Sequence, residues 1–295
     1  MKFINFQLYL YIIRMGIKGL LSHVDQACKD SNISNFKGKT VAIDASCLLH
    51  RALHSISLHR KGITPSFYVK LFLQMLKSYE IKIYLVFDGK PLIEKRKVLS
   101  DRQKYKNLAL QKYQATGNTN YYLRSRNLTS RTIEETIIGC NEMSNVHIIK
   151  SPHEADAQLA YLVKKGYVDA VITEDSDLIV YGCDTIIYKL KLNGECLEYN
   201  KYKLSEIFEN FDFESFRMAC ILAGCDYMPK GFRGYGLKTA CKKLENVPKK
   251  YLNNFLINLL GNDYEMFDKA HKIFLHQRVY DPILNDLIFV NFDIV

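Results

Sequence analysis

KIYLVFD, residues 82–88, is a run of β-branched and aromatic residues that ends in an acid. Three further runs share its apolar character: TVAID at 40–44, DAVIT at 169–173 and residues 185–190. Helical patterns separate these runs, which predicts an α/β fold with a mostly parallel, twisted sheet flanked by helices. Ligands bind at the carboxyl ends of strands in such sheets. Asp44 and Asp88 end two of the runs and therefore lie where a site is expected.

Further acids begin or end other predicted elements. They are Glu154 and Asp156 in SPHEADAQLAYL, Asp175 and Asp177 in VITEDSDLIV, and Asp226 in CILAGCDY. Carboxylates this crowded repel one another unless cations lie between them, and hard oxygen ligands suit Mg²⁺ or Mn²⁺. With Asp44 and Asp88 they number seven, a charge that a folded pocket tolerates only with divalent ions and nearby cations. The pattern predicts a two-metal site that hydrolyses phosphodiesters.

Each acid also has a structural interpretation. Ser151-Pro152-His153-Glu154 fits a helix capping box, with Glu154 reaching back to the cap amide. Asp175 and Asp177 would cap the helix that follows them. A single site accounts for all seven acids together, whereas capping needs a separate explanation for each.

The chain carries 41 Lys and Arg against 31 Asp and Glu, a formal charge of +10 over 295 residues. That imbalance favours a polyanionic partner, with solvated surface lysines as the alternative. The length predicts one globular domain with insertions. The 8 cysteines are scattered without a CxxC pair, which favours a reducing compartment. Cys47, His50 and His54 resemble part of a zinc site but lack a fourth ligand, so core packing is the better interpretation.

Residues 3–13 are apolar but too short to span a bilayer, which needs about 20 residues. A signal peptide would need a small-residue cleavage pattern that is missing here. We expect no membrane association, and interpret residues 1–14 as an extension or an upstream start before Met15.

Residues 94–113 are strongly basic and are interleaved with tyrosines, and QATGNTN at 114–120 is typical of a loop. No apolar stripe wide enough for a core face is present, so this segment is predicted to project from the sheet. Lys95 and Arg102 lie seven residues apart, nearly two helical turns, and so face the same way. They are candidates to stabilise charge on a phosphate, the alternative being a solvated helix.

The chain resembles the flap endonuclease/XPG family of structure-specific 5′ nucleases. MGIKGLL, VAIDASCLLH, LVFDG, EADAQLAYL, ITEDSDL and CILAGCDY are that family's blocks in that family's order, covering residues 15–291. FLHQRVYDPI resembles the exonuclease 1 branch most closely. The resemblance implies a PIN-like nuclease core, a helical arch and a helix-two-turn-helix that grips duplex DNA. The expected regions are residues 1–14 (extension), 15–113 (nuclease region with the start of the arch), 114–132 (arch and loop), 133–226 (internal nuclease region) and 227–295 (helix-two-turn-helix and C-terminal helices).

The resemblance also implies roles for individual residues. Asp44, Asp88, Glu154 and Asp156 would serve one Mg²⁺, and Asp175, Asp177 and Asp226 a second, with Mn²⁺ as a substitute. Lys95 and Arg102 match the catalytic cations of the arch. Gly16, His50, Arg233, Gly234, Gly236 and Lys238 match DNA-contacting positions. The helix-two-turn-helix of the family holds K⁺ partly through a serine, but residues 228–231, Met-Pro-Lys-Gly, contain none; Lys230 is predicted to replace that charge, with K⁺ as the alternative.

The implied activity is 5′-to-3′ double-stranded DNA exonuclease with 5′ flap cleavage, in DNA repair, recombination or replication in the nucleus. The expected substrates are duplexes with a nick, a gap, a blunt 5′ end or a 5′ flap, bound by a monomer. No docking tail for a sliding clamp or mismatch-repair proteins is evident in the sequence. The alternatives are a chain that is primarily a flap endonuclease and a DNA-binding module that has lost catalysis. An aspartyl-phosphate phosphatase is excluded because Lys90 stands where a second Asp is needed.

Overall fold

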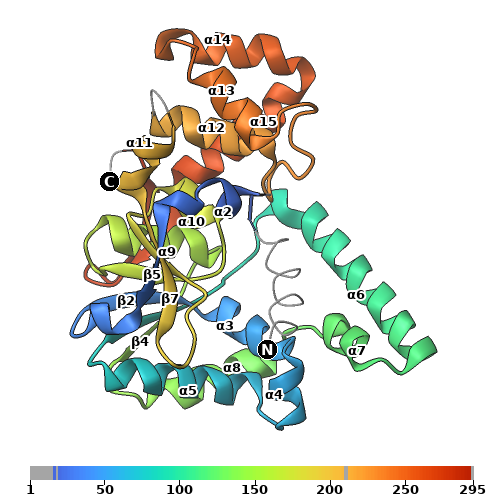
Figure 1. Cartoon of the computed structure of the whole chain (residues 1–295), viewed down its shortest axis with the longest axis vertical. Coiled ribbons are helices and arrows are strands. Elements are labelled where there is room, and N and C mark those ends of the chain that lie inside the picture. The colour runs from blue at the N-terminus through green and yellow to red at the C-terminus, as the bar shows by residue number, and fades with distance from the viewer. Residues whose placement is uncertain (1–15, 18, 209–211, 294–295) are drawn as a thin grey trace.

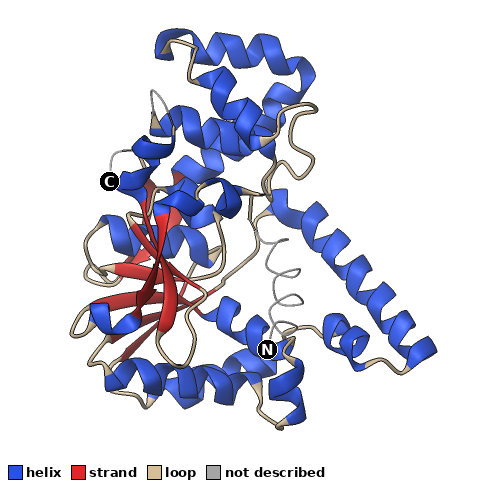
Figure 2. Ribbon diagram, in the orientation of Figure 1, coloured by secondary structure: helices blue, strands red, loops and turns tan. Residues whose placement is uncertain are grey.

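The computed structural model describes residues 16–17, 19–208 and 212–293. The predictions for residues 1–14 and Met15 lie outside the described residues. Within these ranges a seven-stranded sheet, ordered β1-β7-β6-β5-β2-β3-β4, forms the centre, and helices cover it on both sides (Figures 1 and 2). Its strands are β1 (Cys28–Asn32), β2 (Thr40–Asp44), β3 (Lys82–Phe87), β4 (Val146–Lys150), β5 (Ala170–Ile172), β6 (Thr185–Tyr188) and β7 (Glu195–Asn200).

The prediction of a mostly parallel sheet is confirmed. Strands β6, β5, β2, β3 and β4 run parallel, and β7 is antiparallel to both β6 and β1. β2 covers the predicted residues, and β3, β5 and β6 end within two residues of the predicted positions. Because β2, β3 and β5 are parallel neighbours, the acids that follow them meet at one edge of the sheet.

Alternation along β2 separates two cores. Val41 and Ile43 join the core with α3 (Ala45–Leu53), α5 (Pro65–Ser78) and α8 (Ser130–Asn141). Ala42 joins the other core, which contains side chains of α9 (Ala155–Lys164), α10 (Asp177–Tyr181) and α12 (Phe213–Ala223). Successive side chains of a strand face opposite sides, so both faces of the sheet are covered. α2 (Leu20–His23) and α4 (Ile56–Arg60) are shorter helices.

The basic segment forms a projecting helical arm. A 3-10 turn at Ile93–Lys95 leads into α6 (Arg96–Thr116), and α7 (Thr119–Ser125) returns toward the body (Figure 1). Only Ala109 of α6 is buried, as the missing apolar stripe predicted. The predicted loop at 114–120 is wrong in length, because α6 continues to Thr116 and only Gly117 and Asn118 separate the helices. Gly117 ends α6 in a left-handed conformation, and the side chain of Asn118 caps α7.

The last part of the chain combines helices with a hairpin that the sequence did not predict. α11 (Leu204–Ile207), α13 (Leu237–Leu244), α14 (Lys249–Leu260) and α15 (Tyr264–Leu275) complete the helices. The expectation of helix throughout 227–295 is wrong beyond Leu275, where β8 (His276–Asp281) pairs antiparallel with β9 (Asp286–Asn291).

The hairpin is hydrogen-bonded to α9. The Gln158 amide donates to the Tyr280 carbonyl and accepts from the Tyr280 N–H, both at 2.8 Å. The Tyr161 hydroxyl donates to the Asp281 carboxylate, and the Lys164 ammonium donates to the carbonyl of Phe292 just beyond β9. These bonds attach the hairpin along the helix that begins at the acidic cluster.

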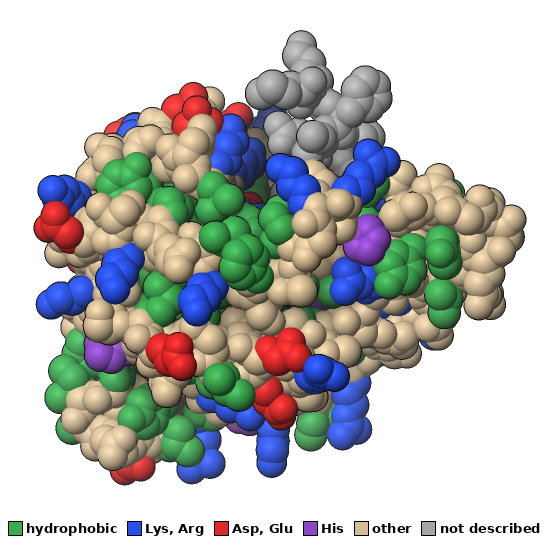
Figure 3. Space-filling model, turned by 90° about the horizontal axis from the view of Figure 1, so that it is seen from below, with side chains coloured by type: hydrophobic (Ala, Val, Ile, Leu, Met, Phe, Trp, Pro, Cys, Tyr) green, Lys and Arg blue, Asp and Glu red, His purple; other side chains and the backbone are tan. Residues whose placement is uncertain are grey.

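Two features of the composition, the basic residues and the cysteines, can be located in the structure. In the view from below, Lys and Arg side chains are spread over the face rather than gathered in one patch (Figure 3). All eight cysteines have free thiols. Among the described residues, no helix combines the length and apolar character needed to cross a bilayer.

Candidate metal and nucleic-acid site

The structure brings the seven predicted acids to one end of the sheet. Asp44 ends β2, Asp88 follows β3, and Asp175 lies in the loop after β5. Glu154 and Asp156 lie at the start of α9, Asp177 begins α10, and Asp226 follows α12. Asp88 is exposed, whereas the other six are buried to between 1% and 8% exposure.

Burial, together with repulsion between neighbouring carboxylates, raises the pKa values of four of the acids. Burial, and then the charge of Asp88, raise the pKa of Asp44 to about 7. Burial and a neighbouring carboxylate raise the pKa of Asp175 to about 6. Burial, and then the charge of Asp175, raise the pKa values of Asp156 and Asp177 well above the usual range. Each acid therefore lies within the electrostatic range of others, as one shared site requires.

The Asp177 carboxylate indicates that the cluster fits a cation. Its Oδ1 is buried and has no hydrogen-bond partner among the described residues. A buried carboxylate oxygen without a partner is costly, and a divalent ion would satisfy it. Among the described residues, however, no group of three or more His, Cys, Asp or Glu side chains is arranged so that it could hold a metal ion. The assignment of particular acids to two metals therefore stays a prediction.

Two cations of the arm already contact the acids. The Lys95 ammonium lies 2.9 Å from Glu154 Oε1 and 3.0 Å from Asp226 Oδ2. One Arg102 nitrogen donates to both oxygens of Asp226, at 2.9 and 3.2 Å. Burial opposes the charged form of Lys95, but Asp226 and Glu154 raise its pKa well above the usual value. Lys95 and Arg102 thus converge on one carboxylate. The sequence predicted that the two side chains face the same way, but not that they contact Asp226.

The predicted capping box is wrong. α9 begins at Ala155, and Glu154 precedes it without a side-chain cap bond. Instead the Ala155 N–H donates to Asp88 Oδ1 at 2.8 Å, and Ser46 donates to the other oxygen at 2.6 Å. Ser151 donates to backbone carbonyls. An acid distant in sequence therefore caps α9, which leaves the Glu154 side chain directed to Lys95.

Gly16 lies against Asp175 and Asp177, and its φ is +72°. A Cβ added there would be 2.3 Å from Ser176 Oγ and 2.4 Å from Asp175 Oδ1. We expect Gly16→Ala to lower the cleavage rate of DNA about 10²-fold, since displacements near 1 Å in a reactive site cost that much. Gly19→Ala is the matched control, because Gly19 has φ of +80° with nothing within 4 Å of its Cβ position. Equal loss of activity in the two variants would contradict a role for the contact.

A buried ion pair that the sequence did not predict supports the Asp175 loop. Arg51 of α3 pairs with Glu174, which also accepts from the Lys189 N–H at 3.0 Å. Arg51 donates to the Leu190 carbonyl at 2.6 Å as well. The pair joins α3 to the residue preceding Asp175. The sign of this ion pair in the sequence is Glu174, an acid in TEDSD (residues 173–177) that was not among the seven predicted ones.

We expect Glu174→Gln to lower the free energy of unfolding by about 3–5 kcal/mol, because it leaves Arg51 buried without a counter-charge. Adding Arg51→Met to that variant should restore most of the loss. Urea unfolding of the single and double variants measures both. A loss under about 1 kcal/mol in the single variant, typical of an exposed pair, would contradict this account.

The remaining predicted DNA contacts lie on two other elements. His50 is in the last turn of α3, stacked on His54 at 5.7 Å, and burial lowers its pKa to about 3. The His54 ring contacts the Leu123 carbonyl of α7 at 2.7 Å, so this pair lies where the arm meets the body. The other predicted contacts are exposed and lie at or just before the start of α13. Gly236 precedes this helix and leaves its first amides without a side-chain cap. These contacts are Arg233, Gly234, Gly236 and Lys238. Lys230 is exposed too, and its predicted role stays a prediction.

Two family models match the segments of the chain that contain the seven acids. Residues 15–109 match the XPG N-terminal domain and residues 145–226 match the XPG I-region. Exonuclease 1 of Xenopus laevis is 34% identical over 94% of this chain and 41% of its own length. DNA damage-inducible protein DIN7 of Saccharomyces cerevisiae is 33% identical over 94% of this chain and 69% of its length.

A solved structure shares the fold. Flap endonuclease-1 from Methanococcus jannaschii superimposes with a TM-score of 0.61 at 26% identity, over 84% of this chain and 81% of that one. The chain spans about two fifths of the length of the first curated relatives it matches.

Proposed function

Because the chain belongs to the XPG family, we propose that it is a metal-dependent 5′-to-3′ exonuclease of double-stranded DNA that also cleaves 5′ flaps. The observation that carries the proposal is the convergence of buried acids on one sheet edge, with Lys95 and Arg102 of the arm in contact with Asp226. The identity to exonuclease 1 supports the exonuclease activity.

We assign the acids to two ligand sets for Mg²⁺, as the resemblance to the family implies, with Mn²⁺ as a substitute. Asp44, Asp88, Glu154 and Asp156 would hold one ion, and Asp175, Asp177 and Asp226 the other. When bound, the ions activate water and offset the negative charge of the phosphate that is hydrolysed. The unpartnered Asp177 oxygen and the raised pKa values of its neighbours support this donor set.

Residues of the chain supply the remaining functions. Lys95 and Arg102 bind the oxygens of the scissile phosphate once they leave the acids, and stabilise the charge that develops there. His50 lies beside the nucleotide at the cut. The uncapped amides of α13 and Lys238 hold a phosphate of the uncut duplex, a contact that does not depend on base sequence.

We further propose that the chain acts as a monomer in the nucleus on duplexes with a nick, a gap, a blunt 5′ end or a 5′ flap. The names of its relatives, which refer to exonuclease activity and to DNA damage, support a role in DNA repair. An inactive DNA-binding module is disfavoured, since buried acids would only repel DNA.

A primary role as a flap endonuclease is the second candidate. The projecting arm formed by α6 and α7 favours it, because such an arm can enclose a single strand. The structural match to a flap endonuclease supports the same candidate.

One experiment separates these activities. Nicked, blunt and flapped duplexes, labelled at either the 5′ or the 3′ end, are incubated with the protein with and without Mg²⁺. We expect a ladder of mononucleotides from the 5′ end only with Mg²⁺. Release of intact flaps without mononucleotides would favour the second candidate, and no cleavage of any substrate would contradict both.

A further inference from the structure

Tyr227 is held against Glu154 by a short hydrogen bond. Its hydroxyl donates to Glu154 Oε2 at 2.6 Å, and the side chain is only 5% exposed. The other Glu154 oxygen, Oε1, contacts Lys95. Glu154 has no cap bond to its own helix, so α9 itself does not fix the direction of this side chain. The phenol is thus a partner that orients the carboxylate.

The position of Tyr227 is fixed by a tight turn. Cys225 and Met228 exchange two backbone hydrogen bonds, at 3.1 and 3.3 Å, so Asp226 and Tyr227 are the two residues at the tip. Asp226 faces Lys95 and Arg102, while Tyr227 faces Glu154. The tip of this turn therefore supplies both Asp226, one of the seven acids, and Tyr227, the hydrogen-bond partner of Glu154.

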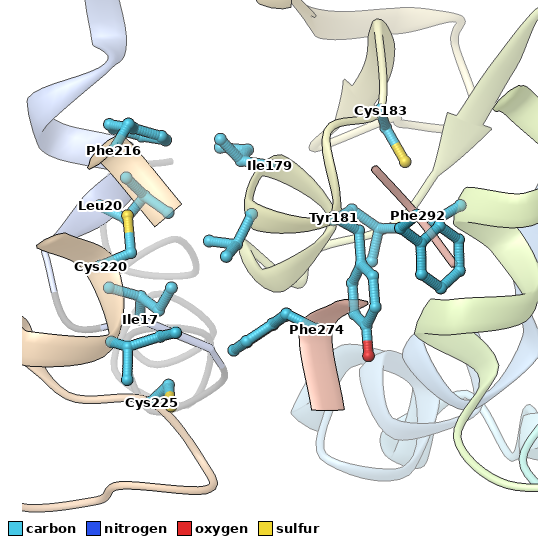
Figure 4. Packing of buried hydrophobic residues seen from close by; sticks show 14 of the residues in the cluster. Ile17, Leu20, Ile179, Tyr181, Cys183, Phe216, Cys220, Cys225, Phe274 and Phe292 are labelled. Atoms are coloured by element: carbon cyan, nitrogen blue, oxygen red, sulfur yellow. The ribbon is translucent and has the colours of Figure 1, made fainter. Parts of the chain in front are cut away.

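The ring of Tyr227 is fixed by packing as well. It meets Phe274 of α15 edge-on, with centroids 5.4 Å apart and planes at 72°. Tyr181 of α10 contacts the same Phe274 ring at 5.1 Å and 61° (Figure 4). Tyr199 of β7 is also buried, but its hydroxyl has no hydrogen-bond partner among the described residues.

We propose that Tyr227 is a positioning residue that occupies one oxygen of Glu154, so that the carboxylate presents only Oε1 to the cation at the site. The proposal rests on the proposed function, in which Glu154 is a ligand of a divalent ion. Partners that orient a ligand in this way contribute about 10- to 100-fold to metal affinity or activity. In the absence of metal, the same bond holds Oε1 against Lys95.

Tyr227→Phe removes one oxygen atom and keeps the ring, and Tyr199→Phe, which removes a buried hydroxyl without a hydrogen-bond partner among the described residues, is the matched control. Mn²⁺ binding is measured by electron paramagnetic resonance on the protein without DNA, and the Mg²⁺ concentration for half-maximal cleavage is measured on a nicked duplex. We expect Tyr227→Phe to weaken Mn²⁺ binding about 10- to 100-fold and to raise the required Mg²⁺ concentration by a similar factor. Tyr199→Phe should leave both unchanged.

A second background tests whether the effect passes through Glu154. In a Glu154→Gln protein, adding Tyr227→Phe should change Mn²⁺ affinity no further, whereas a general packing role predicts the same loss in both backgrounds. Unchanged Mn²⁺ binding by Tyr227→Phe, or an equal loss in Tyr199→Phe, would overturn the proposal even if the wild type cleaves DNA. Weaker Mn²⁺ binding by Tyr227→Phe alone would support it even if the wild type cleaves none of the tested substrates. No Mn²⁺ binding by the wild type would overturn both this proposal and the proposed function.

Discussion

Asp175→Asn is expected to lower DNA cleavage by at least about 10³-fold, the upper range for the loss of one electrostatic group in a reactive site. The asparagine keeps the oxygen that accepts from the Asp177 N–H at 2.9 Å, so the loop should keep its shape. DNA binding should persist, because the arm and α13 are unchanged. Cleavage of a labelled nicked duplex and fluorescence anisotropy of the same duplex in Ca²⁺ measure the two effects.

The same variant should be more stable than the wild type without metal. Burial and neighbouring charge raise the pKa of Asp175 to about 6, so at pH 7.5 the ionised form opposes folding, and this penalty disappears in Asp175→Asn. We expect Tm in EDTA to rise by about 2–4 °C. Asp30→Asn, on the exposed part of β1, is the control and should change neither Tm nor cleavage. Wild-type cleavage by Asp175→Asn would remove Asp175 from the site.

Lys95→Met should lower cleavage about 10²–10³-fold and should also destabilise the metal-free protein, opposite to Asp175→Asn. The side chain of Lys95 is 11% exposed and lies between Glu154 and Asp226. Removing one partner of a buried ion pair costs about 3–5 kcal/mol of unfolding free energy. Mg²⁺ should restore most of that stability, because it supplies the missing positive charge, but it should not restore cleavage.

Urea unfolding with EDTA and with Mg²⁺ tests the stability effect, and single-turnover cleavage tests the rate. Lys97→Met is the matched control, since Lys97 belongs to the same basic segment and is exposed. A Lys95→Met protein that is as stable as the wild type in EDTA would show that the ammonium does not offset the repulsion between the acids.

The positions of β2, β3, β5 and β6 and the convergence of the acids at their ends could be predicted because the strands follow local apolar patterns. TVAID is buried on both faces and ends in an acid, and β2 spans those residues. β1, CKDSN, has no such pattern; it is a strand because it pairs with β7, so that Cys28 lies opposite Tyr199. Intrinsic propensity does not contain that information.

Contacts between distant residues limited the prediction of the site. The sequence around Glu154 fits a capping box, but Asp88, brought beside α9 by the parallel sheet, satisfies the helix amide instead. Tyr227 and Glu174 have visible acidic neighbours, yet their roles depend on Glu154 and Arg51, which are more than 70 residues away in the chain. Local pattern therefore identified the acids, whereas the groups that orient them required the structure.

The attachment of the β8–β9 hairpin to α9 bears on the order in which the parts of the site are completed during synthesis. All seven acids have been translated by residue 226, but the Gln158 side chain lacks its backbone partners until Tyr280 has left the ribosome. The helix that carries Glu154 and Asp156 therefore lacks part of its support until the hairpin docks. We expect a chain truncated after Leu275, before the hairpin, to cleave DNA more slowly than a chain that includes the hairpin.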